Sequence, residues 1–221
     1  PEAGANSYFD GYARLMDLCQ RLEIKSYDYA QRRVPNSTYM IFGETPVEMK
    51  DWPQSPFNLL SEPYRKLPPF GVVNAVVKAK SPLKSPEEWS VPASAPADVS
   101  VYDALRSWGF DDRQIQLIHD TNPQYGSSAY ELSIMMWYFL DAWITRLSQF
   151  GRAEYIALGG NATITDAMAG NLRNDVRLNR EVVSIDDNGR NVEVRTRDGS
   201  RYRGRHVICA LPVPPLRHVR F

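Results

Sequence analysis

The pattern of residues 151–221 constrains the fold most, because short apolar stretches there are separated by turn-forming pairs. Asp187-Asn188-Gly189 and Asp198-Gly199 are typical hairpin turns. Between them, Val192, Val194 and Thr196 alternate with charged residues, which indicates a half-exposed strand. Further strands are expected at Val176–Leu178, at Val182–Ile185 and around Tyr202. The pattern predicts an antiparallel meander.

The meander is framed by a helix and by a more apolar strand. A short strand at Tyr155–Leu158 and Gly159-Gly160 precede a helix that begins at Thr163-x-x-Asp166. Val207–Leu211 is continuously apolar and stops at Pro212. Such a run predicts a strand that is buried on both faces.

Residues 1–150 carry mainly helical signals. Their expected elements are a helix after a cap at Asp10, a strand at Thr38–Phe42 with a turn at Gly43-Glu44, a helix capped by Ser100 and ended by Gly109, a helix at Asp111–His119, and a long helix over Tyr130–Phe150. The last of these is apolar almost all round, which predicts a buried helix.

Prolines restrict the stretch from Pro53 to Pro96, which holds nine of the sixteen in the chain. No long helix fits this density. Short helices are expected around Pro56–Arg65 and Gly71–Lys80. Disorder is the alternative, but the aromatic residues of the stretch, Trp89 among them, are too many for a solvated linker.

Composition excludes several functions. The 26 basic and 26 acidic residues balance, so nothing favours nucleic acid as a partner. The longest apolar run, Ile134–Leu140, is far short of the roughly 20 residues of a transmembrane helix. Two cysteines and three histidines, without metal-ligand spacing, favour neither a disulfide scaffold nor a metal site. We therefore expect a soluble chain, cytoplasmic or exported. No P-loop, GxGxxG or GxSxG motif is present, so catalytic residues cannot be named.

Three stretches together carry a family resemblance. They are Glu2-Ala3-Gly4-Ala5-Asn6-Ser7 with the helix that follows, the run 176–185 with Val192-Glu193-Val194 and Asp198-Gly199, and Val207-Ile208-Cys209-Ala210-Leu211-Pro212. This set closely resembles the FAD-dependent amine oxidases, which include monoamine, polyamine and L-amino-acid oxidases. The likeness is looser in the middle, at Glu131-Leu132-Ser133 and the aromatic helix after it.

The resemblance implies a fold of the α+β or α/β class and three segments. Residues 1–24 and 151–221 would belong to a FAD-binding nucleotide domain, a helix plus β-meander. Residues 25–150 would form a mostly helical substrate-binding domain. The family's GxGxxG strand–turn–helix would lie before Pro1 and its closing segment after Phe221. We therefore expect a central piece of such an enzyme, one that binds FAD weakly or not at all by itself.

Site residues follow from the same likeness. Gly4, Ala5, Asn6 and Ser7 match the strip along the flavin ring, Val182 matches the strand residue that pairs with adenine, and Ala210 and Pro212 lie near the nucleotide. Asn122, Gln124 and Tyr125 fall where the family lines its substrate cavity; an ordinary loop is the alternative. Amino-acid oxidases of the family have an arginine where this chain has Ser7, which disfavours a carboxylate-bearing substrate.

The implied reaction oxidises an amine to an imine, with FAD as cofactor and oxygen as the acceptor that becomes hydrogen peroxide. The expected partners are the amine and oxygen, and a homodimer is one option for assembly. Two other functions stay open. One is a flavin oxidase or desaturase on the same scaffold, acting on a large apolar substrate. The other is a non-catalytic chain that binds no FAD alone.

Overall fold

The computed structural model describes residues 7–29, 39–121 and 126–221. The chain divides into two units, Pro1–Ile164 and Thr165–Phe221, called unit 1 and unit 2. The division falls within one helix, α6 (Ala162–Gly170). Each unit is considered by itself.

Unit 1 contains a small antiparallel sheet built from distant parts of the chain. Its order is β1 (Tyr8–Phe9), β5 (Glu154–Ala157) and β2 (Ser26–Asp28), so β5 lies between the two earlier strands. Helix α1 (Ala13–Arg21) connects β1 to β2, and its Cys19 packs in a cluster with Tyr8, Ala157 and Ile164. Residues 8–28 and 154–164 thereby share one core.

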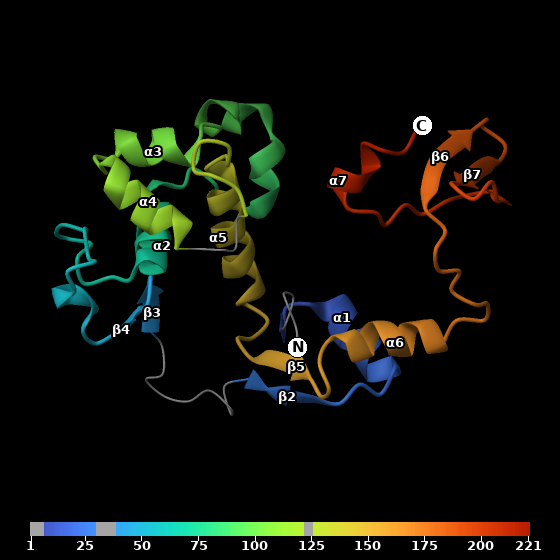
Figure 1. Ribbon diagram of the computed structural model, residues 1–221, viewed down its shortest axis with the longest axis horizontal. Coiled ribbons are helices and arrows are strands. Elements are labelled where there is room, and N and C mark those ends of the chain that lie inside the picture. Colours follow the sequence, from blue (N-terminus) through green and yellow to red (C-terminus); the bar gives the residue numbers. More distant parts are fainter. Residues whose placement is uncertain (1–6, 30–38, 122–125) are drawn as a thin grey trace. The chain divides into compact units, whose positions relative to one another are not determined.

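The rest of unit 1 is helical, apart from the hairpin β3 (Tyr39–Phe42) and β4 (Thr45–Glu48), and is visible on the left of Figure 1. Its helices are α2 (Pro69–Lys80), α3 (Val101–Ser107), α4 (Asp112–Asp120) and α5 (Met135–Leu147), with 3-10 turns η2 (Trp52–Gln54), η3 (Pro86–Ser90) and η4 (Pro92–Ala97). Trp52, Leu105, Ile118 and Trp137 are at most 1% exposed and anchor the core between these elements.

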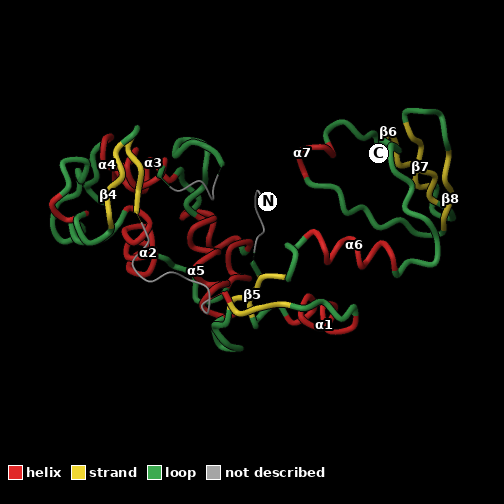
Figure 2. The backbone as a smooth tube through the Cα atoms, turned by 60° about the horizontal axis from the view of Figure 1, so that its bottom comes forward, coloured by secondary structure: helices red, strands yellow, loops and turns green. Residues whose placement is uncertain are grey.

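Unit 2 is the expected meander. Its strands, yellow in Figure 2, are β6 (Val182–Asp187), β7 (Val192–Thr196) and β8 (Arg201–Gly204), paired antiparallel in that order. Gly189 and Gly199 have φ of 79° and 84°, as the two predicted turns require. A short helix, α7 (Val213–Leu216), follows, and Arg220 then pairs in parallel with β6 at Ser184.

Helix signals gave accurate starts where a capping side chain defines them. Ser100 accepts a hydrogen bond from the Asp103 amide, and Asp111 with Gln114 forms a full capping box. Asp10 was expected to cap the first helix, which was wrong. The helix follows Tyr12. The Asp10 carboxylate instead accepts a hydrogen bond from the amide of Ala153, the residue directly before β5.

The long apolar helix is shorter and less buried than expected. It begins at Met135, because residues 128–134 form turns held by Ser128 and Ser133. Met136 and Ile144 are 45% and 55% exposed. Apolar side chains therefore lie on every face of this helix, but not every face is buried within unit 1.

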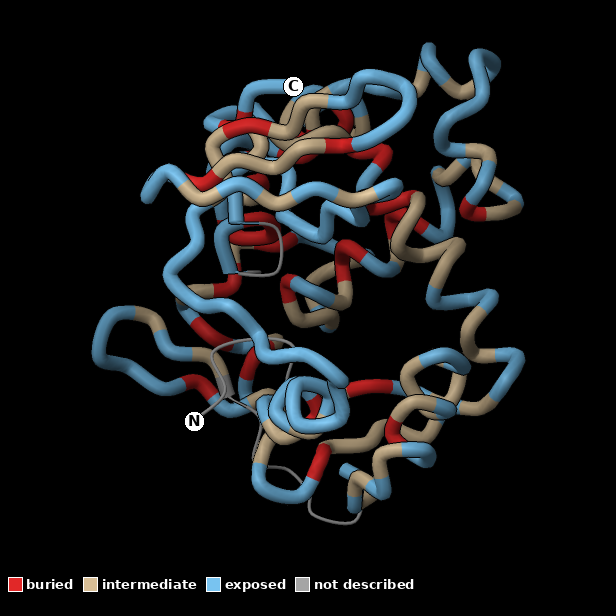
Figure 3. The backbone as a smooth tube through the Cα atoms, turned by 90° about the vertical axis from the view of Figure 1, so that its right-hand side faces the viewer, coloured by how far each residue is buried: buried red, intermediate tan, exposed pale blue. Residues whose placement is uncertain are grey.

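Two predicted strands of unit 2 are wrong. Val176–Leu178 is irregular, with Leu178 74% exposed, and Val207–Leu211 is also irregular, with Ile208 94% exposed. Every residue from 205 to 215 is exposed (Figure 3). A strand buried on both faces needs neighbouring strands and two covering layers, and among the described residues of unit 2 the three strands of the meander pair only with one another and with Arg220.

The proline-rich stretch is ordered. Helix α2 matches the expected Gly71–Lys80, whereas Pro56–Arg65 forms turns around the buried amide of Asn58 rather than a helix. Trp89 lies in η3. In the described residues, no helix combines the length and apolar character needed to cross a membrane.

Candidate functional site

Unit 2 has a cavity of about 480 Å³ at the start of β6. Val182, Leu211, Pro215 and Val219 form its apolar wall. Its polar lining residues are Arg180, Glu181, Arg197 and His218. The volume lies within the roughly 300–1,000 Å³ usual for small-molecule sites, and apolar walls with a few polar groups are typical of them.

The return of the chain after the meander builds this cavity. Beyond β8 the chain runs through 205–212 into α7, and Val219 is buried. Arg220 then donates its amide to the Val183 carbonyl and accepts from the Ile185 amide. These two bonds fasten the end of the chain to the free edge of β6, so α7 stands beside Val182.

The backbone of β6 is irregular at the end that lines the cavity. The register between β6 and β7 shifts between Val182 and Ser184, as at a β-bulge. Bulges bend a strand and redirect side chains, and they are frequent beside functional sites. Val182 itself is half-buried.

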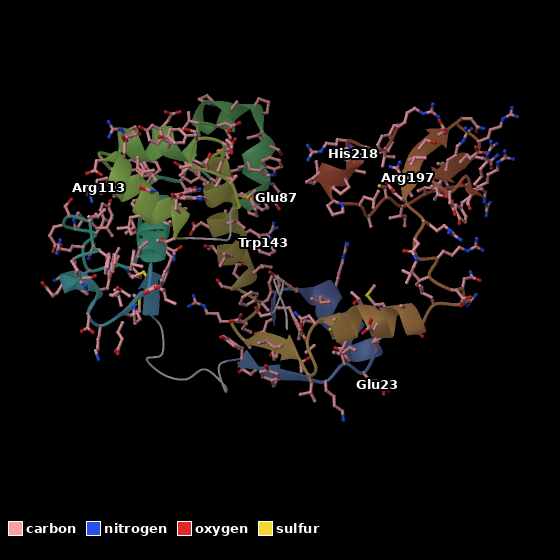
Figure 4. All side chains as sticks on the ribbon, viewed as in Figure 1. Glu23, Glu87, Arg113, Trp143, Arg197 and His218 are labelled. Carbon is pink, nitrogen blue, oxygen red and sulfur yellow. The ribbon has the colours of Figure 1, made fainter. Side chains whose placement is uncertain are left out.

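Two ion pairs line the rim. The Arg197 guanidinium donates two hydrogen bonds, each 2.6 Å long, to the Glu181 carboxylate. Arg180 lies 2.8 Å from the Asp198 carboxylate. The hydrogen bond from Arg197 lowers the pKa of Glu181, and the charge of the same guanidinium lowers it further. Arg197 and His218, which are labelled in Figure 4, both line this cavity.

Several predicted site residues have a place in this structure. Val182 lines the cavity, and Leu211, which also lines it, stands between the predicted Ala210 and Pro212. Ala210 and Pro212 are exposed and irregular rather than at the end of a buried strand. Ser7 is half-buried directly before β1 in unit 1. The predicted residues Gly4, Ala5, Asn6, Asn122, Gln124 and Tyr125 lie outside the described residues.

Sequence reasoning missed the polar half of the cavity. Arg180 and Glu181 directly precede Val182, so their position next to a predicted nucleotide contact was a usable signal. Arg197 and His218 offered none, because only the β6–β7 pairing and the return of α7 bring them to this place.

Comparison with known proteins bears on what this cavity serves. The sequence model of one family, described as flavin containing amine oxidoreductase, matches residues 2–221. The chain belongs to this family. A curated relative, the flavin-containing amine oxidase of Danio rerio, is 38% identical over an alignment of 80 residues that covers 31% of this chain and 15% of that relative.

Solved structures of two amine oxidases share the fold. Cyclohexylamine oxidase from Brevibacterium oxydans superposes with a TM-score of 0.67 at 17% identity, over 94% of this chain and 46% of its own. A putrescine oxidase variant gives a TM-score of 0.65 at 19% identity, over 96% of this chain and 47% of its own. The chain thus spans about half the length of these enzymes. The expected mixed fold is confirmed.

Family membership implies FAD as the cofactor, and unit 2 fits part of it. FAD combines a flat adenine with an anionic pyrophosphate. The cavity offers an apolar wall at Val182, Leu211 and Pro215 that suits an aromatic base. Unit 2 also carries eleven arginines against seven carboxylates, and arginine is the side chain best shaped for phosphate oxygens.

Proposed function

We propose that this chain is part of an enzyme that oxidises an amine to an imine with FAD, and that the cavity beside Val182 holds the adenine end of that cofactor. One observation carries the proposal. Val182, matched to the family's adenine contact, lines the cavity together with Leu211, which lies between Ala210 and Pro212, the two residues matched to its nucleotide contacts.

When bound, the flavin supplies the acceptor for the hydride equivalent that leaves the carbon beside the amine nitrogen. The role of this chain is to bind and orient. Val182 and Pro215 would contact the faces of the base, and the backbone of β6 would offer it N–H and C=O groups. The Glu181–Arg197 and Arg180–Asp198 pairs would hold the rim in shape.

We further propose an electron acceptor, domain boundaries and an assembly for the enzyme. Molecular oxygen would reoxidise the flavin. For each amine molecule that is oxidised to an imine, one O2 molecule would be reduced to hydrogen peroxide. Residues 1–24 and 151–221 would belong to the FAD domain and 25–150 to the substrate domain. The pairing of β1 with β5 supports the grouping of the first segment with the third, although β2 of the same sheet lies at the start of the middle segment. A homodimer is one option for assembly.

Two features favour an amine over other flavin substrates. Two of the structural relatives are named for the amines putrescine and cyclohexylamine. Ser7 places a short hydroxyl where an amino-acid oxidase would have an arginine fork, so a substrate carboxylate would lack its partner there.

The decisive experiment fills the cavity. In the complete gene product, Val182→Phe should lower FAD content and weaken FAD binding about tenfold or more, measured by flavin absorbance and by titration into apoprotein. Val194→Phe is the matched control, since Val194 is a half-buried valine of β7 that does not line the cavity. Equal FAD binding by the two variants would refute the adenine site. A yellow wild-type protein that produces no peroxide with any amine would refute the activity.

A further inference from the structure

Unit 1 has a second, more apolar cavity that the proposed FAD site does not use. It measures about 540 Å³ and lies between α5 and the 3-10 turns η3 and η4. Its apolar lining includes Trp89, Val91, Pro92, Met135, Met136 and Phe139. Trp89 and Met136 remain 54% and 45% exposed, so these walls contact solvent.

The walls are fixed in place. The Trp89 ring meets the Phe139 ring edge-on, with centroids 6.1 Å apart. Arg146 on α5 forms an ion pair with Glu87 on η3, which also lowers the pKa of that carboxyl. Figure 4 labels Glu87 on the turn beside α5. The cavity is therefore a feature of the folded unit rather than a gap between loose segments.

Asp98 places one carboxylate on this apolar surface. Among the lining residues it is the only one with a charged side chain, and among the described residues it forms no ion pair. The Ser133 hydroxyl donates to the Asp98 carboxylate over 2.5 Å and itself accepts from the Met135 amide.

The backbone around Asp98 is held as firmly. The Val99 carbonyl accepts from the Ile134 amide, the Val101 amide donates to the Leu132 carbonyl, and Ser100 bridges to Ser133. A carboxylate held at one point pays little entropy when it pairs with a ligand, since its side chain is already ordered. It lies on a surface whose other lining side chains are uncharged.

We propose that this cavity binds an apolar cation, an ammonium group with an alkyl or aryl tail. The tail would lie against Met135, Met136 and Phe139, and the positive group would lie between the Asp98 carboxylate and the Trp89 ring. Thioether side chains adapt to varied tails, and an indole face attracts a cation. With no cationic side chain in the lining, an anionic ligand would meet only repulsion.

Hexyltrimethylammonium is a suitable probe, because its nitrogen has neither a hydrogen nor a lone pair and so cannot enter amine oxidation. Hexanesulfonate has the same tail and the opposite charge. Binding is followed through ¹³C-labelled methionine methyl groups, assigned with Met135→Leu and Met136→Leu. Because the readout is binding and not flavin reduction, it is independent of the proposed enzymatic function.

The cation should shift the Met135 and Met136 methyl signals saturably, and the sulfonate should bind at least about fivefold more weakly. Asp98→Asn should weaken cation binding about fivefold, the scale of a part-exposed ion pair. Asparagine keeps an oxygen for the Ser133 hydroxyl, so the fold is retained. Asp141→Asn, which removes an α5 carboxylate outside the lining, should change binding less than twofold.

Three results would overturn the proposal. Equal affinity for cation and sulfonate would show that the tail alone binds. Unchanged cation affinity in Asp98→Asn would remove the carboxylate from the site. Absence of a saturable shift, including the case in which a second copy of the chain covers the cavity and the cation does not displace it, would show that a small cation is not the occupant.

Discussion

The guanidinium of Arg197 donates two hydrogen bonds of 2.6 Å to the carboxylate of Glu181. Arg197 directly follows β7, and Glu181 directly precedes β6. The Arg197 amide also donates to the Glu181 carbonyl over 2.8 Å. Side-chain and backbone hydrogen bonds therefore both stabilise this end of the β6–β7 pair, at the rim of the proposed adenine cavity. Because a carboxylate takes part, the stability of this end should depend on pH.

Acidification should destabilise unit 2. Hydrogen bonds from Arg197, from Arg203 with Arg195, and from Thr196 lower the pKa values of Glu181, Glu193 and Asp198 below their usual 4.5, 4.5 and 3.8. A carboxyl with a lowered folded-state pKa stabilises the fold fully above its unfolded pKa and loses that contribution as pH falls through the folded value. Thermal unfolding, followed by amide signals of β7, should therefore shift to lower temperature below about pH 4.5.

Glu181→Gln isolates one contribution. The variant should unfold at lower temperature than wild type near pH 7, and the gap should narrow as pH falls through the lowered pKa of Glu181, where the wild-type carboxyl becomes protonated. Glu131→Gln removes an exposed carboxylate of unit 1 and should leave the β7 signals unchanged. A gap between wild type and Glu181→Gln that persists at low pH would contradict the ion-pair explanation.

Asn58 organises the turns between η2 and α2 and should be costly to replace. Its side-chain amide, 5% exposed, donates to the Trp52 and Arg65 carbonyls over 3.1 and 2.8 Å, and its oxygen accepts from the Leu60 amide. Asn58→Ala leaves buried backbone groups without partners and should destabilise unit 1 by about 2–3 kcal/mol in denaturant unfolding. Asn74→Ala, on the exposed side of α2, should change stability by less than about 0.5 kcal/mol.

Gly151 permits a close approach that no other residue allows. Its φ is 134°, and a Cβ there would lie 2.1 Å from an Asp10 carboxylate oxygen, the one that accepts from the Ala153 amide. Gly151→Ala should destabilise unit 1 by about 1–3 kcal/mol in the same assay. Gly170→Ala, with open space around its Cβ, should be near neutral.

A double variant separates the clash from the backbone strain at this site. Asp10→Ala with Gly151→Ala removes the two closest contacts, at 2.1 and 2.7 Å, and keeps only the contact with the Asp10 Cβ at 2.9 Å, so its loss should be smaller than the sum of the single losses. Strict additivity would show that Asp10 and Gly151 do not interact.

Local signals predicted those elements whose causes are local. Gly189 and Gly199 turn the meander where the residues favour positive φ, and Ser100 and Asp111 begin helices with their own side chains. The wrong strand at Val207–Leu211 has a non-local cause. Apolar character predicts burial, but burial depends on the neighbours that the fold provides, and here Ile208 is almost fully exposed.

In the candidate site, too, local sequence signals predicted some residues, and others are brought there only by the fold. Val182 was predictable because the residues around it form a recognisable family pattern. Its partners Arg197 and His218 come from positions 15 and 36 residues further along the chain, brought there by the β6–β7 hairpin and by the pairing of Arg220. Asp98 in the second cavity looks like one more exposed acid in the sequence, and only its contact with Ser133 distinguishes it.

Ser7 should decide whether the enzyme accepts a carboxylate on its substrate. In the complete gene product we expect a primary or secondary amine to be oxidised far faster than the α-amino acid that differs from it only by a carboxylate. A carboxylate buried without a partner costs several kcal/mol, and each 1.36 kcal/mol on the barrier is about tenfold in rate. Paired measurements of kcat/KM by oxygen uptake test this expectation.

Ser7→Arg should move the preference toward the amino acid, because an arginine fork clamps a carboxylate with two parallel hydrogen bonds. We expect the ratio of the two kcat/KM values to change about tenfold or more in its favour, mainly through KM for the amino acid. Ser7→Met, similar in reach but uncharged, is the control for bulk at this half-buried position and should slow both substrates alike. If wild type oxidised amine and amino acid equally well, the carboxylate would be bound by another cation, and the inference from Ser7 would be wrong.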